Sequence, residues 1–131
     1  MTLVLDANVV VVACSTDDGF GTYGPEELVA PPLMWSEARS GLHEALWRGE
    51  LPAPAAREVL TRLDASPVRP ARPERLGIEA WRIAEELGWA KTYDAEYLAL
   101  ARLLGCRMVT LDARLRRGAD RLGFVFSPTE L

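Results

Sequence analysis

The sequence predicts an α/β fold, a three-layer α/β/α sandwich built around a short parallel sheet. Short apolar runs without charges, typical of strands buried on both faces, alternate along the chain with longer segments of helical periodicity. Strands that alternate with helices pair in parallel and are joined by right-handed crossovers. The length of 131 residues and the hydrophobic fraction of 49% fit one domain, residues 1–131, with an ordinary hydrophobic core.

Two short strands are predicted near the amino terminus. Thr2–Leu5 is apolar and ends at Asp6, and Leu28–Ala30 is a similar run. Between them, Val9–Ala13 fits a strand, because it is rich in β-branched residues, and fits a buried helix equally well, because periodicity does not separate the two in short apolar runs. Residues 15–24 combine three glycines with polar side chains and predict a loop, without the lysine of a phosphate-binding loop.

Two helices and a proline-rich connector follow. Residues 31–48 begin with two prolines, which suit a helix start, and then place apolar residues at helical spacing on one face. Another amphipathic helix begins at Pro52 or Pro54 and ends near residue 65. Residues 66–75 contain three prolines at three-residue spacing, which exclude a helix and predict an edge strand or an extended connector.

The second half of the chain continues the alternation. In order, we expect a helix, a helix, a strand, a basic helix and a last short strand at Glu74–Leu87, Asp94–Leu104, Arg107–Leu111, Ala113–Leu122 and Gly123–Phe126. Gly88 is a stop signal for the first of these helices. The helix that begins at Asp94 is apolar nearly all round, which predicts that it lies deep between other layers.

Several classes of protein are excluded by composition. No apolar stretch approaches the ~20 residues of a membrane helix, and the first basic residue is Arg39, so we expect no membrane association and a cytoplasmic location. Cys14 and Cys106 are far apart in apolar surroundings, which predicts buried thiols and neither a metal motif nor a disulfide framework. His43, the single histidine, is expected on the surface.

Four acidic residues stand out by their positions. Asp6 and Asp112 directly follow predicted strands, and open parallel sheets bind ligands beyond the carboxyl ends of their strands. Asp94 begins the buried helix and is expected to face the interior, whereas Glu37 lies at the edge of an apolar helix face. Taken singly, each aspartate also fits a helix N-cap, and the glutamate fits a solvated helix residue.

Convergence of the four carboxylates would require a counterion. Like charges about 5 Å apart repel by roughly 3 kcal/mol per pair at an effective dielectric constant near 20. A divalent cation would remove that repulsion. Oxygen ligands without a histidine or cysteine cluster suit Mg²⁺ or Mn²⁺ better than Zn²⁺.

The motifs also resemble those of a known family. The chain contains LDAN near its start, a glutamate in WSEARSGL, then TYDAEYLALARLLG, MVTLDARL and a closing GFVF. In this order and spacing they resemble the PIN-domain ribonucleases, especially the VapC-type toxins of bacterial toxin–antitoxin pairs. The resemblance covers essentially the whole chain, is most specific over Thr92–Leu115, and implies a PIN-like sandwich.

The resemblance implies a role for particular residues. The family's acidic quartet, which holds one or two Mg²⁺ or Mn²⁺ ions and activates a water to cut RNA, matches Asp6, Glu37, Asp94 and Asp112. General chemistry agrees, because a bound cation lowers the pKa of its water and neutralises charge that develops on a phosphate. Asn8 and Thr110 match accessory polar positions, although Thr110 also fits an ordinary sheet residue. Many members have Ser or Thr where this chain has Ala7, so a supplementary hydroxyl is missing.

Expected partners follow from charge and from the resemblance. Residues 1–66 have a charge balance of −6 and residues 67–131 one of +2, so the second half is better suited to meet phosphate. Arg114, Arg116 and Arg117 would grip the RNA backbone there, or else form a solvated basic helix face. As a VapC-like toxin, the chain would form a homodimer and be neutralised by a cognate antitoxin protein.

Two other functions compete with that of a metal-dependent endoribonuclease. A catalytically silent PIN fold that only binds RNA or protein would usually have lost part of the quartet, and all four acids are present. A phosphoacceptor receiver module needs an aspartate after its third strand and a later lysine. The middle of this chain is PAPAARE, which contains no aspartate, and its single lysine, Lys91, precedes a helix. The sequence therefore does not fit a receiver module.

Overall fold

A five-stranded sheet, parallel throughout, organises the structure. The computed structural model describes residues 1–131, and its strands are ordered β3-β2-β1-β4-β5. Their bounds are β1 Thr2–Leu5, β2 Glu27–Ala30, β3 Arg69–Pro70, β4 Arg107–Val109 and β5 Val125–Phe126. The central strand β1 is the most enclosed, with Val4 and Leu5 fully buried. The predicted parallel α/β architecture is confirmed.

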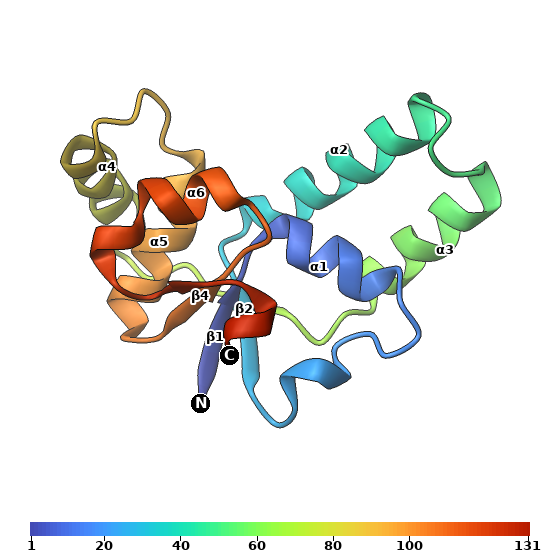
Figure 1. The fold of residues 1–131 in the computed structure, drawn as a ribbon, viewed down its shortest axis with the longest axis horizontal. Coiled ribbons are helices and arrows are strands. Elements are labelled where there is room, and N and C mark those ends of the chain that lie inside the picture. The colour runs from blue at the N-terminus through green and yellow to red at the C-terminus, as the bar shows by residue number, and fades with distance from the viewer.

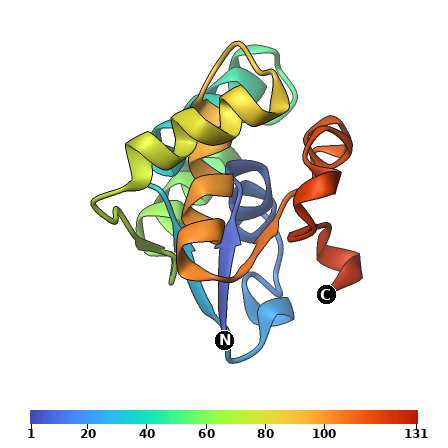
Figure 2. The same ribbon diagram turned by 90° about the vertical axis from the view of Figure 1, so that its left-hand side faces the viewer.

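Helices flank this sheet as two groups (Figure 1). The helices are α1 Ala7–Cys14, α2 Leu33–Trp47, α3 Ala53–Asp64, α4 Leu76–Leu87, α5 Tyr93–Leu104 and α6 Ala113–Gly118. Helices α1, α2 and α3 pack on one another, and α2 and α3 form a hairpin that extends away from the sheet. On the other side α5 packs against β1 and β4, and α4 crosses over it (Figure 2). The layers therefore match the predicted sandwich.

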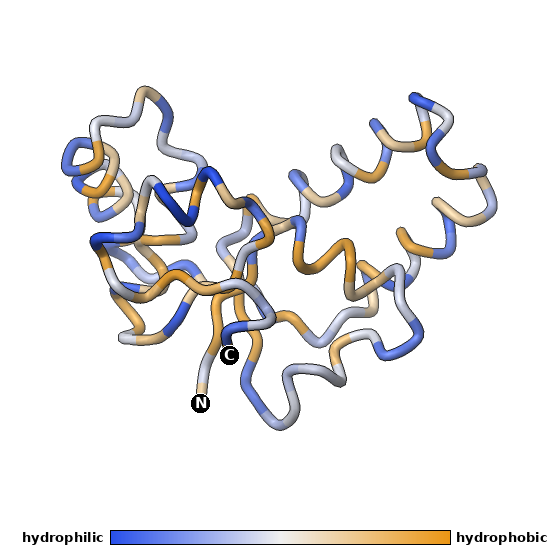
Figure 3. The backbone as a smooth tube through the Cα atoms, in the orientation of Figure 1, coloured by the Kyte–Doolittle hydropathy of each residue, from blue (hydrophilic) through white to orange (hydrophobic).

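The centre of the core is α5. Ala95 and the five residues from Tyr97 to Ala101 are inaccessible to solvent, as expected of a helix that is apolar nearly all round. Gly88 and Gly105 end α4 and α5 in the left-handed conformation that glycine adopts without strain. Hydropathy follows the same pattern, since the apolar colour gathers along the strands and α1 (Figure 3).

The ambiguous segment Val9–Ala13 belongs to helix α1. Asp6 caps this helix, Val9 and Val10 are buried in the core, and the helix packs on α2 and α3. Tertiary packing here overrides the preference of valine for strands. The proline-rich connector supplies the edge strand β3, where a missing N–H is tolerated.

Several predicted boundaries were wrong: α4 begins at Leu76 and not at Glu74, β5 begins at Val125 and not at Gly123, and two further differences lie near the site. The strand expected over Arg107–Leu111 ends at Val109, because the chain turns once the Thr110 hydroxyl accepts a hydrogen bond from the Asp112 N–H. The helix expected over Ala113–Leu122 ends at Gly118 and is followed by a 3₁₀ turn at Asp120–Leu122.

Other sequence-based expectations concern single side chains. Cys14 is buried and Cys106 is half-buried, and both are free thiols. His43 is exposed, as predicted. None of the helices is long and apolar enough to cross a lipid bilayer.

Candidate active site

The pairing of β1 with β4 brings two of the four acids together. In this parallel pair Leu5 lies beside Val109, so both strands end at the same edge of the sheet. Asp6 directly follows β1, and its backbone N–H donates to the Val109 carbonyl at 3.0 Å. Asp112 follows β4 three residues later. The two aspartates therefore lie at one edge through backbone register alone.

A small polar network fixes the carboxylate of Asp6. The Thr110 hydroxyl donates to Oδ2 of Asp6 at 2.7 Å, and Nδ2 of Asn8 donates to the same oxygen at 3.3 Å. Asn8 is held in turn, because its Oδ1 accepts from the Leu111 N–H at 3.1 Å. Asp6 and Thr110 are the only buried polar residues of the chain. The two accessory positions predicted from the sequence thus both contact Asp6.

Asp6 and Asp112 are also helix N-caps, which was the alternative interpretation of each aspartate taken singly. Oδ1 of Asp6 accepts from the Ala7 N–H at the start of α1, at 2.8 Å. Oδ1 of Asp112 accepts from the N–H groups of Arg114 and Leu115 at the start of α6, at 2.9 and 3.2 Å. Each cap directs its aspartate toward the carboxyl edge of the sheet. Capping and convergence are compatible here.

Asp94 differs from its prediction. It is exposed and does not face the interior. It is not a cap either, since the N-cap of α5 is Thr92, whose side chain makes no capping hydrogen bond. Side chains on a helix lean toward its amino terminus. At the second position of α5 no earlier turn lies beneath the side chain, so Asp94 projects past the helix end.

One pocket collects three members of the quartet. Glu37, Asp94 and Asp112 line a pocket of about 500 Å³. Its other lining residues are Trp89, Lys91, Tyr93, Arg114 and Leu115. Trp89 and Lys91 come from the turn between α4 and α5, outside every motif of the sequence, and Tyr93 is the first residue of α5. A pocket with acids on one side and two cations at its rim suits a phosphate-containing ligand held beside a metal ion.

Electrostatic coupling links Asp6 to this pocket. The pKa of Asp6 is raised to about 6, mainly by burial and also by the charges of Asp94 and Asp112. The hydrogen bond from Thr110 acts in the opposite direction and lowers the pKa. Partial removal from water also raises the pKa of Glu37 and of Asp94, although Asp94 keeps much of its surface exposed. A hydrogen bond from Tyr97 opposes the increase at Glu37, whereas the charges of Asp6 and Asp94 add to it. The carboxylates thus feel one another's charge.

No basic side chain neutralises these carboxylates. Every ion pair of the structure joins other residues, such as Arg102 with Glu79 and Arg62 with Glu58. As they stand, no three histidine, cysteine or acidic side chains lie close enough together to hold a metal ion. The donor set, oxygen only and with excess negative charge, nevertheless fits Mg²⁺ or Mn²⁺.

The three arginines predicted to grip RNA do not share one face. Arg114 lines the acidic pocket. Arg116 instead pairs with Glu130 at 2.7 Å, and Arg117 lies on the outer side of α6 beside Asp120. Of the three, only Arg114 is placed to meet a ligand in the pocket.

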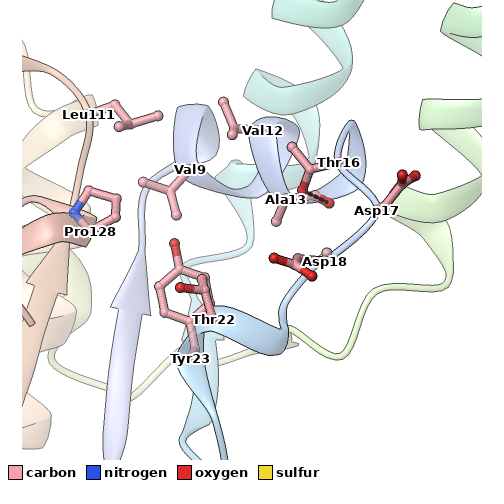
Figure 4. A pocket seen from close by; sticks show the side chains of 11 residues that line it. Val9, Val12, Ala13, Thr16, Asp17, Asp18, Thr22, Tyr23, Leu111 and Pro128 are labelled. Atoms are coloured by element: carbon pink, nitrogen blue, oxygen red, sulfur yellow. Dashed lines mark hydrogen bonds between the residues drawn. The ribbon is translucent and has the colours of Figure 1, made fainter.

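A second pocket of about 480 Å³ lies on the other side of α1 (Figure 4). Val9, Val12 and Tyr23 form much of its wall, and Asp17 and Asp18 lie at its rim. None of the quartet lines it. The acidic pocket remains the candidate active site.

Comparison with known proteins assigns the family. A family model described as "PIN domain" matches residues 3–121. The chain belongs to the PIN-domain family. Two curated relatives are each 33% identical over 114 residues, 86% of this chain and 87% of theirs: VapC ribonuclease Mb0985 of Mycobacterium bovis and ribonuclease VapC9 of Mycobacterium tuberculosis.

A solved structure gives the same fold. The crystal structure of PAE2754 from Pyrobaculum aerophilum superposes on this PIN domain with a TM-score of 0.76, covering 99% of this chain and 92% of that one. The sequences are 24% identical, so this likeness supports the architecture alone. The PIN-like sandwich predicted from the motifs is confirmed.

The raised pKa of Asp6 predicts how stability depends on pH. Its ordinary value is 3.8, so the folded state takes up a proton near pH 6 that the unfolded chain takes up only near pH 4. In chelating buffer, the free energy of unfolding of the wild type relative to Asp6→Asn should therefore rise, by up to ~3 kcal/mol, as the pH falls from 7.5 to 4. Urea unfolding at several pH values measures this. A pH-independent difference would contradict it.

Proposed function

We propose that this PIN domain is the endoribonuclease toxin of a toxin–antitoxin pair and that it hydrolyses RNA phosphodiester bonds with the help of Mg²⁺ or Mn²⁺. The observation that carries the proposal is a pocket lined by three carboxylates and electrostatically coupled to a fourth, Asp6, with no basic partner for any of them among the ion pairs. The similarity to two proteins named VapC ribonucleases supports the same reaction.

Each side chain has a part in this proposal. Asp6, Glu37, Asp94 and Asp112 would hold the cation. When bound, such a cation lowers the pKa of a water and neutralises charge that develops on the phosphate. The hydroxyl of Thr110 and the amide of Asn8 fix the orientation of the Asp6 carboxylate.

The basic rim would bind the substrate. Lys91 and Arg114 line the pocket on which the acids converge, so the phosphates that flank the cleaved bond would lie against them. RNA is thus the proposed substrate and a cognate antitoxin the proposed protein partner. The homodimer and the cytoplasmic location inferred from the sequence stay predictions.

Removal of a metal-binding carboxylate should abolish cleavage. Asp94→Asn keeps the shape of the side chain and removes one negative oxygen, so Mg²⁺- or Mn²⁺-dependent cleavage of RNA should fall at least about a hundredfold. Because Asp94 is exposed and caps no helix, the melting temperature should change little. Asp64→Asn, at the exposed end of α3, is the matched control and should cleave at the wild-type rate.

The same experiment separates the enzyme from a silent binding module. A module that only binds RNA or protein would show no cation-dependent cleavage by the wild type. Full activity in a folded Asp94→Asn variant would remove this residue from the site and leave the family assignment intact.

Cation binding can be tested without RNA. Millimolar Mn²⁺ should raise the melting temperature of the wild type by at least about 3 °C, because a ligand that binds only the folded state stabilises it. Asp112→Asn should shrink this increase, since a charge is lost while the cap of α6 is kept by the amide oxygen. Thermal melts in chelator and in Mn²⁺ measure both effects. Equal increases in the two proteins would exclude Asp112 as a ligand.

The arginines of α6 should differ in their contribution to RNA binding. In an Asp94→Asn background, which keeps the RNA intact, Arg114→Ala should reduce the slope of log affinity against log salt by ~0.7, the loss of about one phosphate contact. Arg116→Ala removes the same charge, but that charge is already paired with Glu130, so the slope should hardly change. Equal slopes for the two variants would contradict this division of α6.

A further inference from the structure

Tyr97 is a buried tyrosine with a single polar contact. It is the largest of the fully buried side chains and has no exposed surface. Its hydroxyl donates to Oε1 of Glu37 at 2.6 Å, and it makes no other hydrogen bond. A hydroxyl removed from water without an acceptor costs several kcal/mol, so this contact is strongly favoured. A short bond to a carboxylate belongs to the stronger, charge-assisted kind.

This bond joins two elements that are otherwise held separately. Glu37 lies on α2, which packs on α1 and α3, whereas Tyr97 lies on α5, which packs on α4 and the sheet. It is the only hydrogen bond or ion pair between α2 and α5. Asp94 precedes Tyr97 by three residues on the same face of α5. One contact therefore relates the position of Glu37 to that of Asp94.

We propose that Tyr97 is a positioning residue of the candidate active site, whose hydroxyl fixes the carboxylate of Glu37 in the acidic pocket. The proposal rests on the metal-dependent function proposed above. Tyr97 occupies Oε1 of Glu37, while Oε2 accepts no hydrogen bond within the protein and is left for a ligand. Glu37 stands alone among the four acids in being held by a side chain of another helix. Thr110 acts similarly on Asp6, but from the neighbouring strand end.

A purely structural role would explain the same bond differently. In that case Glu37 serves only as the acceptor that a buried phenol requires, and loss of the hydroxyl lowers stability without a specific effect on cation binding. The two roles differ in what Tyr97→Phe does to the affinity for Mn²⁺. This substitution keeps the aromatic ring in the core and removes one oxygen.

The test measures Mn²⁺ affinity from the electron paramagnetic resonance signal of free Mn²⁺, without RNA. Tyr97→Phe should weaken binding about tenfold or more, as loss of a group that orients a metal ligand does. In RNA cleavage kcat should fall by a similar factor, with KM within about twofold. Tyr23→Phe is the matched control, since Tyr23 is also buried but lines the other pocket (Figure 4), and it should keep wild-type affinity and rate.

A double-mutant cycle with Glu37→Ala decides whether Tyr97 acts through Glu37. In that background Tyr97→Phe should have no further effect on Mn²⁺ affinity, because its target is absent. Unchanged affinity in Tyr97→Phe alone, or an equal loss in both backgrounds, would overturn the positioning role. Failure of the proposed function looks different, because the wild type itself would then neither bind Mn²⁺ nor cut RNA.

Discussion

The parallel pairing of β1 with β4 is the constraint on which the site depends. It places the ends of two buried strands side by side, so that Asp6 and Asp112 reach one edge of the sheet whatever their side chains prefer. Helix α5 packs against these same two strands and brings Asp94 to that edge with its first turn. Glu37 comes from the α2–α3 hairpin and is connected to α5 by the Tyr97 hydroxyl. The rest of the core stabilises this arrangement without contributing a carboxylate.

The site is locally unfavourable, and the structure shows where that cost is offset. A buried carboxylate such as Asp6 loses hydration, and its raised pKa shows that the hydrogen bonds from Thr110 and Ala7 compensate only in part. Neighbouring acids increase the cost, since like charges disfavour one another's ionised form. The compensation lies in the hydrophobic core, to which the sheet and α5 contribute many of the fully buried apolar side chains. Strongly perturbed groups in a pocket, supported by an otherwise consistent core, are typical of functional sites.

Hydrophobic periodicity predicted the order of helices and strands well, because most elements have a long apolar face or are enclosed on all sides and so give a clear pattern. The all-round apolar pattern of α5 predicted its central position, and the prolines of residues 66–75 predicted the edge strand β3. Where a segment is short, tertiary contacts decide its secondary structure. Helix α1 is an example, because Asp6 caps it and its buried valines pack in the core. The exposure of Asp94 did not follow from helical spacing, because a residue in the first turn has no preceding turn beneath its side chain even when it shares a face with buried residues. Lys91 lies outside every motif, and although Tyr97 lies within TYDAEYLALARLLG, nothing in that motif indicates its contact with Glu37, which depends on how α5 packs.

Helix capping by Asp6 and Asp112 is compatible with the proposed cation binding. At Asp112 a single oxygen, Oδ1, satisfies both backbone N–H groups of the α6 start, so Oδ2 accepts no hydrogen bond from the protein. At Asp6, Oδ1 caps α1 while Oδ2 receives Thr110 and Asn8. A cap fixes the direction of a carboxylate through the backbone, and the positive end of a helix offsets part of the repulsion from other acids. Capping is therefore a means by which this fold holds like charges together before any cation binds, at positions that the strand ends have already determined.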